Sequence, residues 1–281
     1  MNILLNQMLS QADPSQVAGL ARFFKTGPGQ YGEGDKFLGI KVPVTRAVVK
    51  ACWKQLGLPQ LEECIASEYH EVRLAALLTL VEIFSHAGGK RPVATGISRE
   101  DCVRFYLDHT DRINNWDLVD LSCYPLLGEW LLDKDRTLLY DLARDGKTIW
   151  EQRIGMVSTM TFIRHGQLQD TFALADILLH HPHDLIHKAV GWLLREAGKR
   201  DKAALVAWLQ ETPGQAGGDA IAAPAATTAA ATAVTANAPV TPGGNAHVMP
   251  GGDRASQMPR TMLRYAIEKF PDQERQRFLS R

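Results

Sequence analysis

The sequence predicts an all-α fold in which helix pairs stack into a curved solenoid. Apolar residues recur at three- and four-residue spacing in almost every segment, as in "VRLAALLTLVEIF" and "HKAVGWLLREAG", and this spacing is typical of amphipathic helices. Strand-like alternation of β-branched residues is absent. The short breaks between segments carry Gly, Pro and Asp, as in "LDKDR" and "RDGKT", and these residues favour turns.

Several of these segments also resemble one another. Aligning "YHEVRLAALL", "NWDLVDLSCYPLL", "IWEQRIGMVSTM" and "DLIHKAVGWLL" brings four residues into register: Arg73, Asp120, Arg153 and Lys188. Their separations of 47, 33 and 35 residues match HEAT-like helix pairs, in which about 40 residues make one repeat. Equivalent positions of the second helices line the concave face of such a stack. We therefore expect the four side chains to face one groove.

The composition is that of an ordinary soluble globular protein, with 45% hydrophobic and 22% charged residues. No apolar run reaches the roughly 18 to 20 residues that a membrane span needs. The opening "MNILLNQMLSQADPSQ" lacks the basic start of a secretory signal and predicts an amphipathic first helix. The four cysteines lack CxxC spacing: Cys52, Cys64, Cys102 and Cys123. This predicts reduced thiols in a cytoplasmic protein and no metal site.

The net charge of zero does not by itself indicate a nucleic-acid binder. Residues 254–281 nevertheless hold seven Lys and Arg against three Asp and Glu, which leaves 24 basic and 28 acidic residues elsewhere. A basic C-terminal helix could contact phosphate, but a solvated helix end explains the same residues.

We expect a single domain over residues 1–281 with one insertion. From 213 to 256 the composition shifts, and "AAPAATTAAATAVTANAPVTPGGN" carries no charge and no large apolar residue beyond Val. Such a segment cannot bury enough surface to offset its ordering entropy. Residues 213–256 are therefore predicted to be a disordered insertion within the last repeat. A helix resumes at "MPRTMLRYAIEKF", with Pro259 suited to its first turn.

Three predicted helices place Trp and charged residues on one face. The sets are Trp116 with Asp120, then Arg153, and then Lys188 with Trp192 and Arg195. Spacings of three and four bring side chains to the same side of a helix. Each residue has an ordinary explanation, because Trp is usually core, Arg and Lys are usually solvated, and an Asp near a helix start interacts with the macrodipole. Two Trp–charge faces on repeats of one solenoid favour a functional groove instead.

The stretch "RINNWDLVDLS" contains further polar residues. Either Asn114 or Asn115 could cap the helix that begins near Trp116. Asp117 lies about 100° round that helix from Trp116. We assign Asp117 to the helix N-terminus or to a basic group of a neighbouring repeat.

Two other motifs suggest sites at first sight. In "LLHHPHDLIHK", His183 and His187 lie four apart, but Pro182 interrupts them and no third ligand follows, so a polar turn is the better explanation. The loop "GPGQYGEGDKFLG" lacks the Lys-Ser/Thr of a nucleotide P-loop. A plain turn and a backbone contact to phosphate would both fit this loop.

Four motifs together resemble the DNA alkylation repair family, the AlkD-type HEAT-like-repeat alkylpurine DNA glycosylases: "NNWDLVD", "IWEQRIGMVSTM", "HKAVGWLLREAGKRD" and "MPRTMLRYAIEKF". The resemblance runs through "FLGIKVPVTR" to the last helix and omits only the insertion. A W-x-x-x-D, a W-x-Q-R and a G-W-x-L-R-E helix in this order are far more specific than any one alone. The resemblance implies hydrolysis of the N-glycosidic bond of cationic alkylpurines, such as 3-methyladenine and 7-methylguanine, in duplex DNA without base flipping.

The resemblance also implies roles for individual residues. Asp120 matches the catalytic carboxylate, and Trp116 and Trp192 match the aromatic pair beside the sugar and backbone of the lesion. The two phosphate-binding arginines of the family match Arg153 and Arg195. A further family aromatic falls at Phe23, which keeps the ring and lacks a phenolic hydroxyl.

The repeat register adds Lys188 and Arg73 as candidate phosphate contacts. The expected partner is double-stranded DNA containing alkylated bases, bound by a monomer without a cofactor, a metal or a membrane. The expected location is the cytoplasm, at the nucleoid when the protein is bound to DNA.

The expected chemistry agrees with these residue types. Glycosidic cleavage passes through an oxocarbenium-like transition state, and an alkylated purine is already cationic, so it leaves without a general acid. One ionised carboxylate, Asp120, is then sufficient to stabilise the developing charge and to orient or deprotonate water. The alternative is a non-catalytic HEAT-like scaffold that binds DNA or a protein. A scaffold that binds phosphate would favour Lys or Arg at position 120. The residue there is Asp, and this favours the enzyme.

Overall fold

The computed structural model describes residues 2–87, 96–213 and 252–280. Over these ranges the protein is helical and contains no strand, apart from an isolated bridge between Lys36 and Tyr69. The predicted all-α class is confirmed. None of the helices in these ranges is long and apolar enough to cross a membrane.

The helices of the first half begin with the predicted amphipathic segment. They are α1 (Ile3–Ser10), α2 (Pro14–Phe23), α3 (Val42–Cys52), α4 (Leu58–Ile65), α5 (His70–His86), α6 (Arg99–Asp108), α7 (Trp116–Asp120) and α8 (Thr137–Asp145). Three short non-α turns accompany them, namely the 3₁₀ turns η1 (Trp53–Gln55) and η2 (Thr110–Arg112) and the π turn η3 (Tyr124–Gly128).

The second half of the chain contains eight helices, of which α12 is the longest among the described residues. They are α9 (Ile149–Ser158), α10 (Met160–Arg164), α11 (Gln169–Ile177), α12 (Asp184–Arg200), α13 (Lys202–Gln210), α14 (Arg254–Gln257), α15 (Arg260–Ala266) and α16 (Asp272–Leu279).

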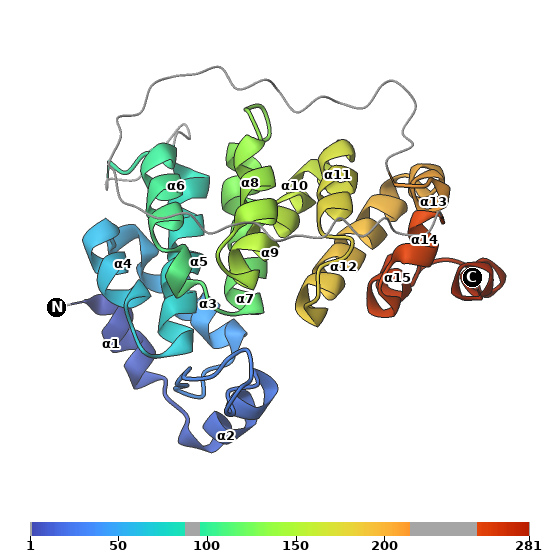
Figure 1. Cartoon of the computed structure of the whole chain (residues 1–281). Helices are drawn as coiled ribbons and strands as arrows, with labels where there is room; N and C mark the ends of the chain where they lie inside the picture. The colour runs from blue at the N-terminus through green and yellow to red at the C-terminus, as the bar shows by residue number, and fades with distance from the viewer. Residues whose placement is uncertain (1, 88–95, 214–251, 281) are drawn as a thin grey trace, which may run out of the picture.

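The helices follow one another across the molecule in chain order, from the N-terminal helices at one end to α15 at the other, and α2 extends below the row (Figure 1). Pairs of helices pack together, including α4 with α5, α8 with α9 and α12 with α15. This order is the one that a stack of helix pairs requires.

The four helices that carry the register residues are neighbours in this row. Helix α5 contacts α7, α7 contacts α9, and α9 contacts α12. They carry Arg73, Asp120, Arg153 and Lys188 respectively. The register therefore identified helices that lie side by side.

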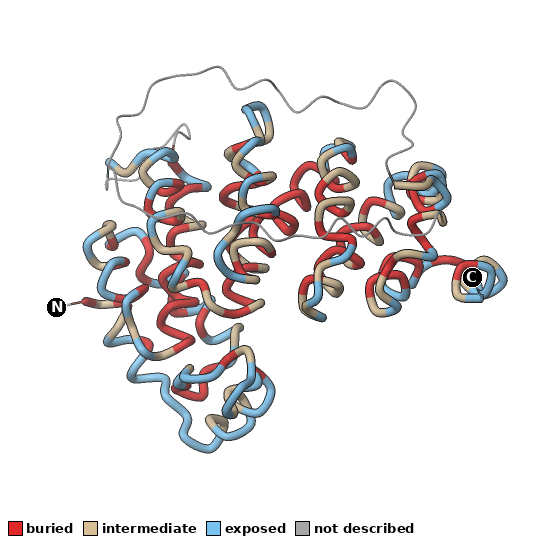
Figure 2. The backbone as a smooth tube through the Cα atoms, in the orientation of Figure 1, coloured by how far each residue is buried: buried red, intermediate tan, exposed pale blue. Residues whose placement is uncertain are grey.

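A single cluster of buried apolar side chains runs from Leu4 to Phe278. Buried residues lie where the helices face one another, and exposed residues lie on the outer turns (Figure 2). Helix α5 is buried on nearly every side, as expected of a helix that is apolar all round. Close approach of α12 and α15 depends on Gly191, because a Cβ there would lie 2.5 Å from the carbonyl oxygen of Met262.

Helix α7 is short because the chain leaves α-helical geometry directly after Asp120. Pro125 has no N–H to donate and lies in the π turn η3. A π turn inside a helix often marks a functional site.

The predicted insertion at 213–256 was too long at its C-terminal end. Residues 214–251 lie outside the described residues, but Arg254 and Ser256 belong to α14. Arg254 is buried, with Nε 2.6 Å from Asp176 Oδ1 and Nη1 2.9 Å from Glu211 Oε2. These ion pairs hold the start of α14 against α11 and α13, and composition alone does not reveal them.

Candidate active site

The register residues of three helices meet at one pocket of about 560 Å³. Seven of its lining residues were predicted from the sequence: Phe23, Trp116, Asp120, Arg153, Lys188, Trp192 and Arg195. They come from α2, α7, α9 and α12. We call this the carboxylate pocket, because Asp120 is the acidic residue among its lining residues in the described part of the chain.

Local capping sets the start of α7. The side-chain oxygen of Asn115 accepts a hydrogen bond from the backbone N–H of Trp116 at 2.9 Å, so Asn115 is the N-cap. Asn114, the other candidate, instead contacts Asp35 and Arg73.

Asp120 is held by a two-point ion pair with Arg153. Nε of Arg153 donates to Oδ1 at 2.8 Å, and Nη2 donates to Oδ2 at 2.7 Å. Nη1 donates to the backbone oxygen of Leu185 at 2.5 Å, which fixes the guanidinium between α7 and α12. This fork matches a carboxylate and fixes its orientation as well as its charge.

Arg153, predicted to contact phosphate, lies at the pocket and bonds to other residues of the protein. Arg153 is only 5% exposed and its guanidinium is bonded to Asp120 and Leu185. Spacing placed it correctly at the pocket, but spacing does not distinguish a phosphate ligand from a partner for a nearby carboxylate.

The electrostatic environment of Asp120 contains two opposing effects. The pKa of its carboxyl group is raised, because the effect of burial exceeds that of the positive charge of Arg153, which acts to lower it. The side chain of Asp120 is 14% exposed, so one edge of the carboxylate remains accessible from the pocket. The ion pair favours the ionised form of the carboxyl group.

Trp116 is fixed by other aromatic rings. It stacks on Phe24 with ring centroids 5.4 Å apart, and Phe23 meets it edge-on at 5.8 Å. Phe23 is 60% exposed, so it forms the outer edge of the pocket. Phe24 is buried behind Trp116 and was not singled out from the sequence.

Two tyrosines that sequence reasoning missed also line the pocket, Tyr31 and Tyr265. Tyr31 lies in the Gly-rich loop after α2 and contacts Trp150 edge-on at 6.0 Å. Burial raises the pKa of Tyr31, so its hydroxyl stays protonated at neutral pH. An aromatic residue inside an otherwise small, polar loop was the signal that could have identified it.

Lys188 and Arg195 lie at the rim and are paired with acidic side chains. Lys188 Nζ is 2.6 Å from Asp184 Oδ2, and both side chains are substantially exposed. Arg195 bonds to Glu268 and to Glu196. The Lys188–Asp184 pair is exposed on both sides, and exposed pairs are weak, so a phosphate could replace Asp184 there.

Arg73, predicted to contact phosphate, does not line the carboxylate pocket. Its side chain is buried and donates to Asp35 Oδ1 at 2.6 Å, to Asn114 at 3.0 Å and to the backbone oxygen of Ser67 at 3.0 Å. The loop that carries Asp35 covers Arg73. The backbone of Arg73 is therefore equivalent to that of Arg153 and Lys188 in the repeat register, but its side chain has different surroundings.

Asp117 pairs with a basic group of a neighbouring helix, one of the two predicted assignments. Its Oδ2 is 2.8 Å from Nε2 of His70 on α5. Asp117 therefore points toward α5, while Asp120 points toward Arg153 on α9.

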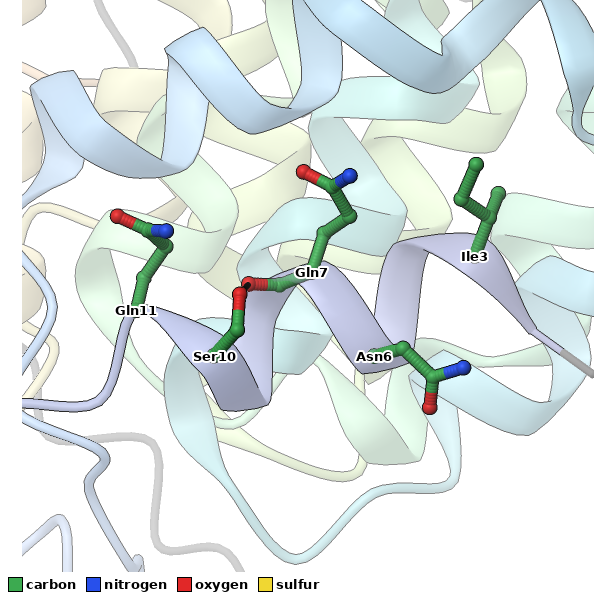
Figure 3. Close-up of a pocket in the computed structure, with 5 residues that line it drawn as sticks. All are labelled: Ile3, Asn6, Gln7, Ser10 and Gln11. Atoms are coloured by element: carbon green, nitrogen blue, oxygen red, sulfur yellow. Dashed lines mark hydrogen bonds between the residues drawn. The ribbon is translucent and has the colours of Figure 1, made fainter.

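Several further hollows lie on the described surface, and three of them differ from the carboxylate pocket in their lining. An apolar one of about 430 Å³ shares Trp116 and Asp120 with the carboxylate pocket. A basic one of about 450 Å³ shares Trp192 and includes Arg164 and Lys199. The third lies on α1 between uncharged side chains such as Asn6 and Gln7 (Figure 3). Its lining residues carry no ionisable side chain, so it is not a chemical centre.

The histidine motif forms a helix cap. Nδ1 of His183 accepts a hydrogen bond from the backbone N–H of Leu185 at 3.1 Å, and α12 starts there. Among the described residues no group of three or more His, Cys, Asp or Glu is arranged to hold a metal ion.

The fold and the pocket define a class: an all-α protein of stacked helices whose pocket combines one carboxylate, several aromatic rings and cations. Residues 4–270 match the family model for the DNA alkylation repair enzyme, and the chain belongs to this family. This confirms the family resemblance of the motifs and supports a role in DNA repair.

A solved structure described as a predicted DNA alkylation repair enzyme from Enterococcus faecalis has a similar fold. The TM-score is 0.53 at 17% sequence identity, over 70% of this chain and 88% of that chain. No curated protein sequence matches the chain.

Proposed function

We propose that the protein is a DNA glycosylase that hydrolyses the N-glycosidic bond of cationic alkylated purines, such as 3-methyladenine and 7-methylguanine, in duplex DNA. The observation that supports this most strongly is the oriented carboxylate of Asp120 in a pocket that Trp116 and Trp192 also line. We propose that the lesion is approached from the duplex surface without base flipping.

The single carboxylate fits the chemistry of a cationic substrate. As the glycosidic bond breaks, positive charge develops on the sugar and the base leaves neutral, so no acid has to protonate it. An ionised Asp120 would stabilise the sugar cation and accept a proton from the attacking water. Glycoside hydrolases need a second carboxyl group to protonate the leaving group. Alkylation has already given the purine its positive charge, so this second group is not needed here.

Arg153 would serve Asp120 rather than the DNA. Each carboxylate oxygen of Asp120 accepts one hydrogen bond from the guanidinium, which leaves its remaining lone pairs for water and the sugar. The same contact counteracts the effect of burial on the pKa of Asp120. Arg153 would therefore both orient the carboxylate of Asp120 and favour its ionised form.

The aromatic lining would recognise the positive charge of the lesion. Trp116 and Trp192 line the pocket together with Phe23 and Tyr31. A cation against an aromatic face gains roughly 0.5 to 2 kcal/mol, depending on how far it is desolvated. This interaction favours an alkylated purine over an unmodified, neutral one.

Phosphates would be held at the rim. Lys188 and Arg195 lie on the same face of α12 as Trp192, and Lys199 continues that face toward the basic hollow with Arg164. We propose that the DNA backbone follows this face, because phosphate contacts position a duplex without reading its sequence.

The scaffold alternative is supported by the carboxylate partners of Lys188 and Arg195, which reduce the positive charge of the rim. One assay separates the two functions. The protein is incubated with duplex DNA that contains 7-methylguanine, and released bases are quantified by chromatography. A glycosylase releases base faster than the protein-free control, whereas a scaffold binds the duplex in a salt-sensitive manner and releases none.

A further inference from the structure

Close to the carboxylate pocket lies a second set of charged side chains, which we call the buried ionic cluster: Asp35, His70, Arg73 and Asp117. Their side chains are only 1% to 4% exposed. None of them lines the carboxylate pocket. Burying four charged groups is costly unless they are paired, so the cluster requires an explanation.

The geometry fixes the charge of His70. Its Nδ1 lies 3.2 Å from Asp35 Oδ2, and its Nε2 lies 2.8 Å from Asp117 Oδ2. Ionised carboxylate oxygens only accept hydrogen bonds, so both ring nitrogens must carry protons and the ring is an imidazolium. Arg73 adds a second cation on Asp35. Two cations thus face two anions, and the cluster is neutral.

The cluster joins three segments of the chain. Asp35 comes from the Gly-rich loop between α2 and α3, His70 and Arg73 from the first turn of α5, and Asp117 from α7. Asn114 adds a hydrogen bond to Asp35 Oδ1 at 3.0 Å. The loop carries Tyr31, and α7 carries Asp120, so the cluster connects two walls of the pocket.

Backbone contacts fix the loop at the same place. The backbone N–H of His70 donates to the Lys36 carbonyl at 2.8 Å. The carboxylate of Glu71 accepts the N–H groups of residues 38 to 40 at 2.9 to 3.1 Å. Gly32 allows close packing, because a Cβ there would lie 2.4 Å from the carbonyl oxygen of Phe24. The first turn of α5 is therefore a docking point for the loop.

Ring contacts connect His70 to the pocket. His70 lies 4.7 Å from Phe24 and stacks on Phe37 at 4.9 Å between ring centroids. Phe24 in turn stacks on Trp116. The imidazolium, the phenyl ring and the indole form a continuous series of contacts from α5 to the pocket wall.

We propose that His70 is a positioning residue: its imidazolium holds the Gly-rich loop against α7 and thereby sets the relative places of Tyr31, Trp116 and Asp120. The effect of His70 on catalysis rests on the proposed function. The effect on the loop does not.

The charge of His70 persists well above neutral pH. Burial acts to lower the pKa of His70, but hydrogen bonds to Asp117 and Asp35 raise it to about 9. The other charged groups around the ring are Arg73 and Glu71 on α5, with Asp120 further along α7. Deprotonation would leave two buried carboxylates sharing one neutral ring, so the loop is expected to loosen above pH 9.

The test uses His70→Gln in the full-length protein, with His109→Gln as the matched control. His109 also bonds to a carboxylate, Glu62 at 2.9 Å, but lies outside the pocket and the cluster. Hydrogen exchange of the loop amides is measured without DNA, and single-turnover base release and duplex affinity are measured with it.

For His70→Gln we expect faster exchange of amides 30–36 than in either the control or the wild-type protein. We also expect base release to slow by roughly 10- to 100-fold, the scale of a small misplacement of catalytic groups, with duplex affinity within about twofold. Unchanged loop exchange would overturn the proposal. If the wild-type protein released no base, the proposed function would fail, and the exchange experiment would still decide the role of His70.

A measurement on the wild-type protein covers the case in which His70→Gln does not fold. Ring ¹⁵N chemical shifts of His70 report its protonation directly. The imidazolium pattern should persist through neutral pH and titrate near pH 9. A neutral ring at about pH 7, near the usual pKa of histidine, would contradict the proposal.

Discussion

Two aspartates of the same short helix, α7, each pair with a cation of a different neighbouring helix. Asp117 faces His70 of α5, and Asp120 faces Arg153 of α9. The first belongs to a cluster closed off by the loop that carries Asp35, whereas the second opens onto the carboxylate pocket. The same pairing of an aspartate with a neighbouring cation is therefore enclosed at Asp117 and partly open at Asp120.

The difference shows that the solvent exposure of an ion pair determines whether it can act on a substrate. The side chain of Asp117 is 4% exposed and that of Asp120 is 14% exposed. An enclosed pair can only stabilise the arrangement around it, because no substrate reaches it. A pair with one open edge can hold a carboxylate in place and still present it to water and a sugar.

The largest effect on stability is expected from Arg73→Met. Removing one partner of a buried pair leaves an uncompensated charge, here Asp35, and costs about 3 to 5 kcal/mol. Urea denaturation measures the free energy of unfolding. Arg153→Met is the matched variant, and its loss should be smaller because Asp120 can turn toward water. An equal loss for the two variants would remove the distinction between the enclosed and the open pair.

The two groups should also differ in their dependence on pH. The pKa of His70 is raised to about 9 and that of Asp35 is lowered to about 2. The contribution of His70 is complete below its unfolded value near 6.5 and is lost as pH rises through about 9. The contribution of Asp35 is present above about 4 and is lost as pH falls through about 2.

Thermal unfolding followed across pH 6 to 10 tests this expectation. The wild-type melting temperature should decline between about pH 6.5 and 9, the interval between the two pKa values of His70. His70→Gln should lack that decline. Parallel curves for the two proteins would show that His70 is not the group that titrates.

A moderate effect on base release is expected from Trp192→Ala. The loss of one aromatic contact to a cationic base corresponds to roughly 0.5 to 2 kcal/mol, or a few-fold to about 30-fold in rate. Single-turnover assays on 7-methylguanine duplexes measure it. Trp130→Ala is a suitable control, because Trp130 contacts Lys134 and does not line the carboxylate pocket.

The smallest effect is expected from Lys188→Ala. One lost phosphate contact should weaken duplex affinity a few-fold and reduce the slope of log affinity against log salt by about 0.9. Lys134→Ala is the control, since its side chain is about as exposed as that of Lys188 and lies elsewhere. Identical salt slopes for the two variants would exclude Lys188 from the DNA contact.

The sequence predicted those features that depend on periodicity. Helical spacing identified α7, α9 and α12 and brought Trp116, Asp120 and Trp192 to one pocket. Tyr31 was missed because a Gly-rich loop has no period, and its place is set by contacts with segments distant in the sequence. The sequence did not predict that Arg73 is buried away from the pocket, because a repeat register fixes a backbone position and does not show which loop covers it.

Similar reasoning explains the end of the insertion. Low complexity up to residue 251 says nothing about Arg254, whose ion pairs with Asp176 and Glu211 join residues 78 and 43 positions apart. Long-range pairing of this kind is invisible to composition.

The central claim is that Asp120 is the catalytic carboxylate, and Asp120→Asn tests it most directly. Asp141→Asn is the control, because Asp141 is an exposed acid away from the pocket. Single-turnover release of 7-methylguanine should fall about 10²- to 10⁴-fold in Asp120→Asn, with duplex affinity retained. Release at the wild-type rate by Asp120→Asn would contradict the account.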